Sequence, residues 1–270
     1  MPVSKQKKNT MTDSYKDDNM QTVFGLELYW QKAMRSVERL QKTQAETIRS
    51  AARACVDCIE RDGVIHAYGT GHSRAFAMEL AGRAGGLVPV NRLDLEDLVL
   101  HAGWSPEVAM HPDIERNLQA GEALLNCYHI EPQDIFLICS NAGINVTIVE
   151  VARQIKQRGH MLIAVTSLEH TWQMSPRHAS GQRLCEIADI VIDNQSPFGD
   201  ALLTLPDGSV ACAISSITGA LIAQALTAEI IGQLMAKGQD VPVFLSSNVP
   251  GGIERNAGLI QRYSDRIRPV

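Results

Sequence analysis

Short, unbroken apolar runs recur along the middle of the chain, and between them apolar residues return at helical spacing. The runs, which we interpret as strands, are Val64–Tyr68, Leu87–Val90, Ile135–Cys139, Met161–Thr166 and Ile190–Asp193. Unbroken apolar strands are typical of a parallel sheet that is covered on both faces. Because strands that alternate with helices form right-handed crossovers, the pattern predicts an α/β fold with a doubly wound, mainly parallel sheet flanked by helices.

A helical pattern precedes the first strand and occupies residues 22–61. This span is long for one globular helix, so we expect either a break near residues 42–45 or a long N-terminal helical arm that lies on a partner subunit. An uncovered apolar side on such an arm predicts a homodimer or a dimer of dimers. Residues 1–20 are polar and predict a disordered tail, which leaves one domain over residues 21–270.

Residues 208–228 carry no charged side chain, so a membrane span has to be weighed there. Hydroxyl and amide side chains interrupt the stretch, and a serine leads it. These features favour a buried core helix, with no membrane contact. The remaining tail predicts a short strand, a Pro-Gly-Gly turn and a closing helix.

Composition narrows the class of protein. The chain has 270 residues, of which 45% are hydrophobic and 20% charged, as in ordinary soluble domains. A net charge of -5 gives no footprint for nucleic acid. The six cysteines are scattered and no signal peptide precedes them, which predicts a reduced, cytoplasmic protein. Cys55 and Cys58 have metal-ligand spacing, but without a second pair we expect buried helix residues and no metal.

The turn at residues 69–73, Gly-Thr-Gly-His-Ser, joins the first strand to a helix that the pattern extends to Ala84. Free amides and the helix dipole at such a turn favour an anion. A dinucleotide fingerprint needs a small residue where this chain has Arg74, and a phosphate-binding Walker loop needs a Gly-Lys pair that is absent. The turn therefore suits a phosphate or a sugar hydroxyl, unless Ser73 merely caps the helix.

A second turn of this kind, residues 140–145, follows the strand at Ile135–Cys139 and precedes a helix predicted over Val146–Lys156. Ligands of doubly wound sheets bind outside the carboxyl ends of the strands, where both turns fall. The long connection at residues 91–117 carries several carboxylates and imidazoles, including Asp94, His101 and His111. It supplies ligands or acid/base groups, or it is a solvated lid.

Four pieces in order resemble the SIS (sugar isomerase) domain family: GTGHS at 69–73, SNAGIN at 140–145, IADIVIDN at 187–194 and AISSITGA at 213–220. The resemblance covers residues 22–270. More narrowly, the segments GHSRAFAMELAGRAGGL, SPRHASGQRL and PVFLSSNVPGG are similar to single-domain proteins of this family. The resemblance implies the SIS fold, an anionic or phosphorylated sugar as the ligand, and no metal or redox cofactor.

The resemblance also implies which residues bind the sugar. The expected binding residues are Gly71, His72, Ser73, Ser140, Asn141, Gly143, Asn145, Arg177, Ser215, Ser216 and Thr218. The family usually has Ser-x-Ser-Gly-x-Ser/Thr in the second turn, and this chain has Ala142 and Asn145 at the later two hydroxyl positions. Losing one hydroxyl donor costs about 1.5 to 3 kcal/mol of phosphate binding. The ligand therefore carries a weaker anion, or its phosphate is bound by backbone amides and by Arg177 in place of the missing hydroxyl.

Aldose to ketose isomerisation needs a base for the C2 proton and a group that protonates oxygen. We predict Glu79 as the first, because a carboxylate among apolar helix residues is costly without a role or a partner. Its alternative is a structural pair with Arg83. His178 is the second candidate, and its alternative is a plain surface histidine. The function is then a sugar-phosphate isomerase, with a non-catalytic sugar-phosphate sensor or a lyase/etherase as the alternative.

Overall fold

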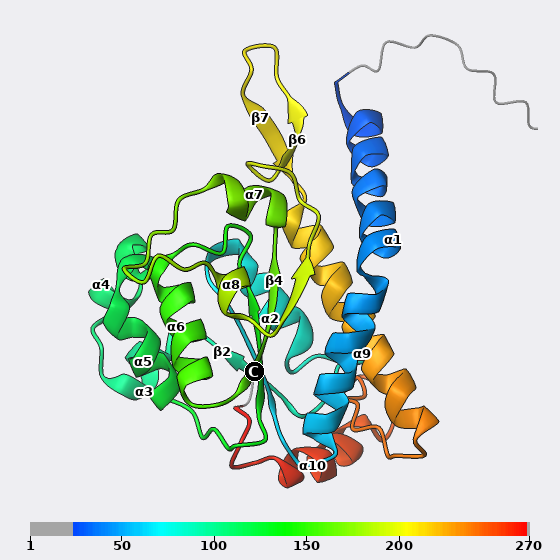
Figure 1. Cartoon of the computed structure of the whole chain (residues 1–270). Helices are drawn as coiled ribbons and strands as arrows, with labels where there is room; N and C mark the ends of the chain where they lie inside the picture. Colours follow the sequence, from blue (N-terminus) through cyan, green and yellow to red (C-terminus); the bar gives the residue numbers. More distant parts are fainter. Residues whose placement is uncertain (1–23, 269–270) are drawn as a thin grey trace, which may run out of the picture.

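The computed structural model describes residues 24–268, so the predicted tail at 1–20 lies outside the described residues. Five parallel strands form one sheet in the order β2-β1-β3-β4-β5. Their bounds are β1 Ile65–Gly69, β2 Val90–Leu93, β3 Ile135–Cys139, β4 Met161–Thr166 and β5 Ile190–Asp193. The predicted parallel, doubly wound sheet is confirmed, because helices cover both of its faces (Figure 1).

The helices pack in two layers around the sheet. The first layer is α1 Leu26–Ile59, α2 Arg74–Leu80 and α9 Ser215–Ala236, which share one apolar core with the sheet. The second layer is α3 Asp97–Ala102, α4 Pro106–Ala109, α5 Leu118–Asn126, α6 Val146–Gln157 and α8 Leu184–Ile187. The short elements η1 Gly71–Ser73, η2 Pro112–Arg116 and α7 Leu168–Gln173 lie in the connections, and α10 Gly252–Arg262 closes the chain.

Within the sheet, the strand prediction is off by several residues only at the edge strand β2, and the short strand predicted in the tail is a single bridge at Val243. β2 begins at Val90 and not at Leu87, because Leu87 bridges Val243 in the C-terminal tail. α2 likewise ends at Leu80, since Ala81 adopts an extended backbone, so the predicted continuation to Ala84 is wrong. A tail more than 150 residues away in the chain thus takes the backbone hydrogen bonds of this segment.

α1 is one uninterrupted helix, which rules out the break near residues 42–45 and leaves the long helical arm, the other alternative. At 1.5 Å per residue it is about 50 Å long. Its second half packs on α9. Its first half extends along a hairpin, β6 Ala201–Thr204 and β7 Val210–Ala213 (Figure 1). Lys32 Nζ donates to Leu202 O of that hairpin at 2.9 Å.

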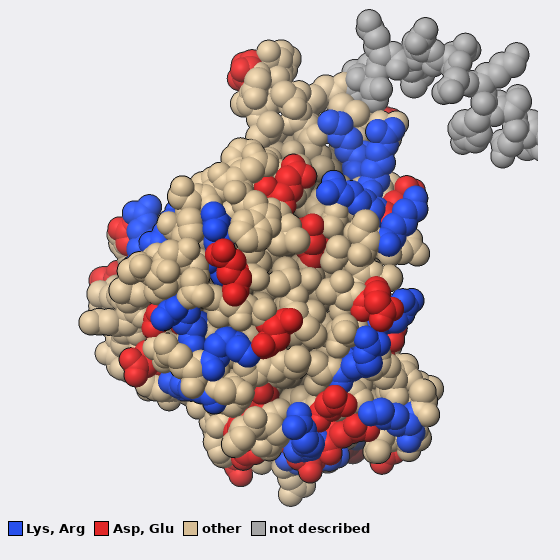
Figure 2. Space-filling view, in the orientation of Figure 1, with Lys and Arg blue, Asp and Glu red and all other residues tan. Residues whose placement is uncertain are grey.

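α9 is long and apolar enough to cross a membrane by composition alone. In the fold it packs between α1 and α2, and Ile222, Leu226 and Ile230 enter the shared core, as the core-helix prediction requires. The β6–β7 hairpin was not predicted, although Asp207-Gly208 is a turn signal for it. Figure 2 shows acidic and basic side chains interspersed over one face, with basic ones over the first half of α1.

Candidate functional site

The two glycine-containing turns meet at the carboxyl end of the sheet. β1 and β3 are neighbours, and from this pair the strand order runs to β2 on one side and to β4 on the other. The crevice outside such a pair is where open α/β sheets bind ligands. The first turn, residues 69–73, follows β1, and the second turn, residues 140–145, follows β3, as the sequence predicts.

The first turn folds tightly on itself. A Cβ at Gly69 would lie 2.4 Å from the carbonyl oxygen of Ser73, and Gly71 has a φ of +54° that favours glycine. The Ser73 side chain makes no capping hydrogen bond to α2, so the helix-cap alternative is wrong. It contacts the buried Cys139 thiol instead, whose pKa is raised to about 12 by burial. The Ser73 hydroxyl therefore lies beside the end of β3, in the crevice.

The second turn holds its shape through Ser140, whose Oγ accepts a hydrogen bond from the Gly143 amide at 3.2 Å. Gly143 has a φ of +63°, and a Cβ there would lie 2.9 Å from Thr166 Oγ1. The Asn141 amide oxygen accepts from Asn194 Nδ2 at 2.9 Å and from Ser196 Oγ at 2.7 Å. That side chain is therefore committed to the protein's own loops.

Asn145 is the residue before α6, and its side chain makes no capping hydrogen bond to that helix. Its Nδ2 donates to Glu115 Oε2 at 2.5 Å, and its Oδ1 accepts from Arg177 Nη1 at 2.8 Å. The structure therefore brings together the predicted residues Asn145 and Arg177. It adds Glu115, which the sequence reasoning did not single out.

Glu115 lies between the two turns. Its Oε1 is 3.6 Å from the position that a Cβ on Gly71 would take. The residues beside it are fixed, because Thr147 Oγ1 donates to the Ile114 carbonyl at 2.7 Å and to the Asn117 carbonyl at 3.1 Å. Within residues 24–268, no arginine or lysine forms an ion pair with this carboxylate. The only available signal was its place in the carboxylate-rich loop that precedes the second turn.

Tyr68, the last side chain before the first turn, is completely buried, and its hydroxyl has no hydrogen-bond partner among residues 24–268. Burial raises the pKa of Tyr68, and the charges of Glu115 and Asp94 raise it further. Asp94 itself pairs with Arg74, the residue after Ser73, at 2.6 Å. Arg74 is therefore paired with a carboxylate and is not a free cation for a ligand.

The start of α9 closes the other side of the first turn. Ser215 and Ser216 line a narrow pocket of about 10 Å³ together with His72 and Ser73. The Asp200 carboxylate accepts hydrogen bonds from the Ser215 amide at 2.8 Å and from the Ser215 hydroxyl at 2.6 Å. A carboxylate therefore already occupies this helix start. Thr218 is fully buried, and its hydroxyl bonds the Ser215 carbonyl.

The two predicted acid/base residues have other partners. Glu79 pairs with Arg83, as its structural alternative requires, and accepts a hydrogen bond from Gln224 Nε2 at 2.7 Å. His178 is buried and not a surface histidine: its Nε2 donates to Glu150 at 3.0 Å, and its Nδ1 accepts from the Ser180 amide.

His101 and His111 remain half-exposed or exposed in the long connection. Over the described residues, no group of three His, Cys, Asp or Glu side chains is arranged to hold a metal ion.

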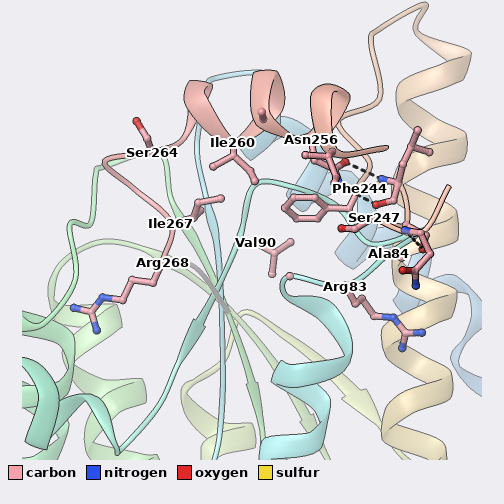
Figure 3. Close-up of a pocket in the computed structure, with 16 residues that line it drawn as sticks. Arg83, Ala84, Val90, Phe244, Ser247, Asn256, Ile260, Ser264, Ile267 and Arg268 are labelled. Carbon is pink, nitrogen blue, oxygen red and sulfur yellow. Dashed lines mark hydrogen bonds between the residues drawn. The ribbon is translucent and has the colours of Figure 1, made fainter. Parts of the chain in front are cut away.

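A more voluminous cavity than the one beside the first turn lies elsewhere, beside the amino end of β2. It has a volume of about 690 Å³ and lies under α10, with Arg83 and Arg268 at opposite ends and Val90, Phe244 and Ile260 between them (Figure 3). It includes no residue of either turn.

A family model of the SIS domain matches residues 28–167, which is more than half of the chain. The chain belongs to the SIS domain family. It is 38% identical over 241 residues to a UPF0309 protein of Listeria monocytogenes, covering 88% of this chain and 97% of the relative. A UPF0309 protein of Caldanaerobacter subterraneus is 36% identical over 247 residues, covering 90% of this chain and 99% of the relative.

The SIS fold is also found in solved structures of low sequence identity. A phosphoheptose isomerase from Neisseria gonorrhoeae has a TM-score of 0.53 at 17% identity, covering 76% of this chain and 96% of that one. A phosphoheptose isomerase from Francisella tularensis has a TM-score of 0.53 at 18% identity, covering 79% and 100% of the two chains. These similarities show the SIS fold, including the parallel sheet that carries the two turns.

Proposed function

We propose that this SIS protein binds a phosphorylated or otherwise anionic sugar across the two turns and interconverts its aldose and ketose forms by proton transfer. The observation that carries the proposal is the meeting of the first and second turns at the point where the strand order reverses. Such a crevice offers free backbone amides and hydroxyls without needing a bound cofactor. The named activity of the two phosphoheptose isomerases that share the fold supports the same reaction class.

In this proposal, the sugar's anionic group contacts the amides of both turns, the hydroxyls of Ser73 and Ser140, and the guanidinium of Arg177. Because Ala142 supplies no hydroxyl, Arg177 has to contribute the missing charge-assisted hydrogen bond. Arg177 Nη1 is held beside the second turn by its hydrogen bond to Asn145 Oδ1, at 2.8 Å. His72, Ser215 and Ser216 line the adjoining pocket and contact the sugar hydroxyls. The predicted cytoplasmic location stays a prediction.

The experiment is a thermal-shift screen against aldose and ketose phosphates, followed by NMR detection of deuterium incorporation at C2 of any sugar that binds. The proposal expects binding and exchange in heavy water. Binding without exchange would identify a sensor, and the absence of binding to every sugar phosphate would contradict the proposed site.

We also propose that the protein is a homodimer or a dimer of dimers. Leu26, Trp30 and Met34 are exposed on the first half of α1, and Ile217 and Leu221 are partly exposed on α9. Contiguous apolar side chains of this kind mark subunit contacts. Analytical ultracentrifugation at micromolar concentration should give at least a dimer, and a stable monomer would contradict the proposal.

A further inference from the structure

We propose that Glu115 is the base that moves the proton between C2 and C1 of the sugar, an inference that rests on the proposed function. Glu115 is the one carboxylate in the described chain that joins both turns: it accepts from Asn145 of the second turn at 2.5 Å and lies 3.6 Å from the Cβ position of Gly71 in the first. A sugar that bridges the turns therefore contacts this carboxylate directly.

The position of Glu115 is fixed from both sides along the chain. Ile114 is buried, and Thr147 of α6 holds the carbonyls of Ile114 and Asn117. η2 is therefore tied to the same helix that begins with the second turn. A base has to be held within hydrogen-bond reach of the proton that it removes, and this double attachment provides that geometry.

The contacts of Glu115 leave part of its carboxylate without a charged partner. Its hydrogen bond comes from a neutral amide, and no cation within residues 24–268 pairs with it. Glu79, by contrast, is held by Arg83 and Gln224. Arg177 donates to the other end of the Asn145 amide, which fixes the orientation of Asn145 and through it the carboxylate of Glu115.

The buried hydroxyl of Tyr68 is consistent with this role. It has no partner in the described structure, and the charges of Glu115 and Asp94 lie close enough to raise its pKa. A buried hydroxyl without a partner costs free energy that a bound ligand would recover.

In the step that we propose, the Glu115 carboxylate takes the C2 proton of the open-chain aldose. The electrons of the C2–H bond form the C1–C2 double bond, and the C1 carbonyl π electrons move to O1, giving an enediolate. The O2 proton then passes to O1 through water. As the C2 carbonyl forms, C1 recovers the proton from the Glu115 carboxylic acid. No electrons are lost, and the carboxylate is regenerated.

The test compares Glu115→Gln, Glu115→Asp, Glu79→Gln and the control Glu122→Gln, using the first sugar phosphate that binds the parent. Glu122 is exposed on α5, belongs to neither turn and allows the same substitution. Exchange at C2 should fall by about 10² to 10⁴ in Glu115→Gln while affinity stays within a few-fold, because a base acts mainly in the transition state. Glu115→Asp should recover part of the exchange, and the other two variants should match the parent.

The outcomes separate this inference from the proposed function. Exchange in the parent that persists in Glu115→Gln overturns Glu115 as the base and leaves the isomerase standing. Loss of exchange in Glu79→Gln alone assigns the base to Glu79. If Glu115 only occupies the anion site, Glu115→Gln will bind the sugar phosphate more tightly with unchanged exchange. A parent that binds but never exchanges overturns both proposals together.

Discussion

The two ends of the central sheet use the same kinds of side chain in opposite ways. At the amino end, the buried Asp134 carboxylate accepts hydrogen bonds from the backbone amides of Val64 and Glu131, each at 2.8 Å. It also accepts hydrogen bonds from His66 Nε2, at 3.1 Å, and from the Arg266 guanidinium. At the carboxyl end, the Glu115 carboxylate accepts a hydrogen bond from one neutral amide, and the Tyr68 hydroxyl has no partner in the described part of the chain. The first carboxylate is saturated by the protein, whereas the second retains capacity for a ligand.

The difference separates stability from function. A charge taken out of water is tolerated when several donors surround it, and removing it leaves those donors unpaired. A polar group that the fold leaves incompletely paired lowers stability, which is expected where a ligand completes the bonds. Cavity volume does not indicate which end of the sheet binds the ligand, because the cavity of about 690 Å³ lies at the amino side, away from both turns.

The largest expected effect concerns the amino end. Asp134→Ala leaves His66 and Arg266 without their buried partner, so we expect the free energy of unfolding to fall by about 3 to 5 kcal/mol. Urea denaturation of the variant, with Glu122→Gln as the exposed control, measures this change. The folded fraction should still bind the sugar with parental affinity. A loss under about 1 kcal/mol would break the comparison from this side.

The carboxyl end should respond in affinity and not in stability. Ser73→Ala and Ser140→Ala should each weaken sugar binding by roughly ten- to a hundredfold, because each removes a charge-assisted hydrogen bond. Isothermal titration measures the affinity, and the melting temperature should hardly change. Ser140 Oγ also holds the Gly143 amide, so the Ser73 variant is the cleaner measurement. Parental affinity in both variants would mean that the turns are structural only.

Acid should destabilise the amino end first. Burial opposes ionisation of Asp134, but the bonds from His66 and the backbone prevail and lower its pKa to about 2. Against an ordinary value of 3.8, this contributes about 2 kcal/mol, present above pH 4 and lost as the pH falls toward 2. Burial also lowers the pKa of His66, so protonation of the unfolded chain below about pH 6.5 acts in the same direction. Unfolding free energies measured from pH 7 to pH 3 should fall in the parent and fall less in Asp134→Asn.

The smallest expected effect is at Glu79, between the two ends. Its pair with Arg83 is partly exposed, so Glu79→Gln should change stability by less than about 0.5 kcal/mol. Thermal denaturation of this variant and of Arg83→Gln checks the value. A loss above about 2 kcal/mol would show that the Gln224 contact anchors α2 to α9 more firmly than exposed pairs do.

The apolar runs alone predict the bounds of three strands correctly: Ile135–Cys139, Met161–Thr166 and Ile190–Asp193. Nearly all of their side chains are buried or partly buried in the sheet, so the apolar run and the strand coincide. They failed at Leu87, whose partner is a tail residue that local periodicity does not reveal. The turns could be predicted because glycines and hydroxyls are local signals. Glu115 could not, since its contacts with Gly71 and Asn145 exist only after η2 folds against α6.

A crystal structure of the protein with the tightest sugar phosphate from the screen tests the central claim most directly. The sugar should bridge residues 69–73 and 140–145, with its anionic group on the turn amides and C1 or C2 within about 3.5 Å of the Glu115 carboxylate. A sugar bound instead in the cavity under α10, between Arg83 and Arg268, would contradict the account.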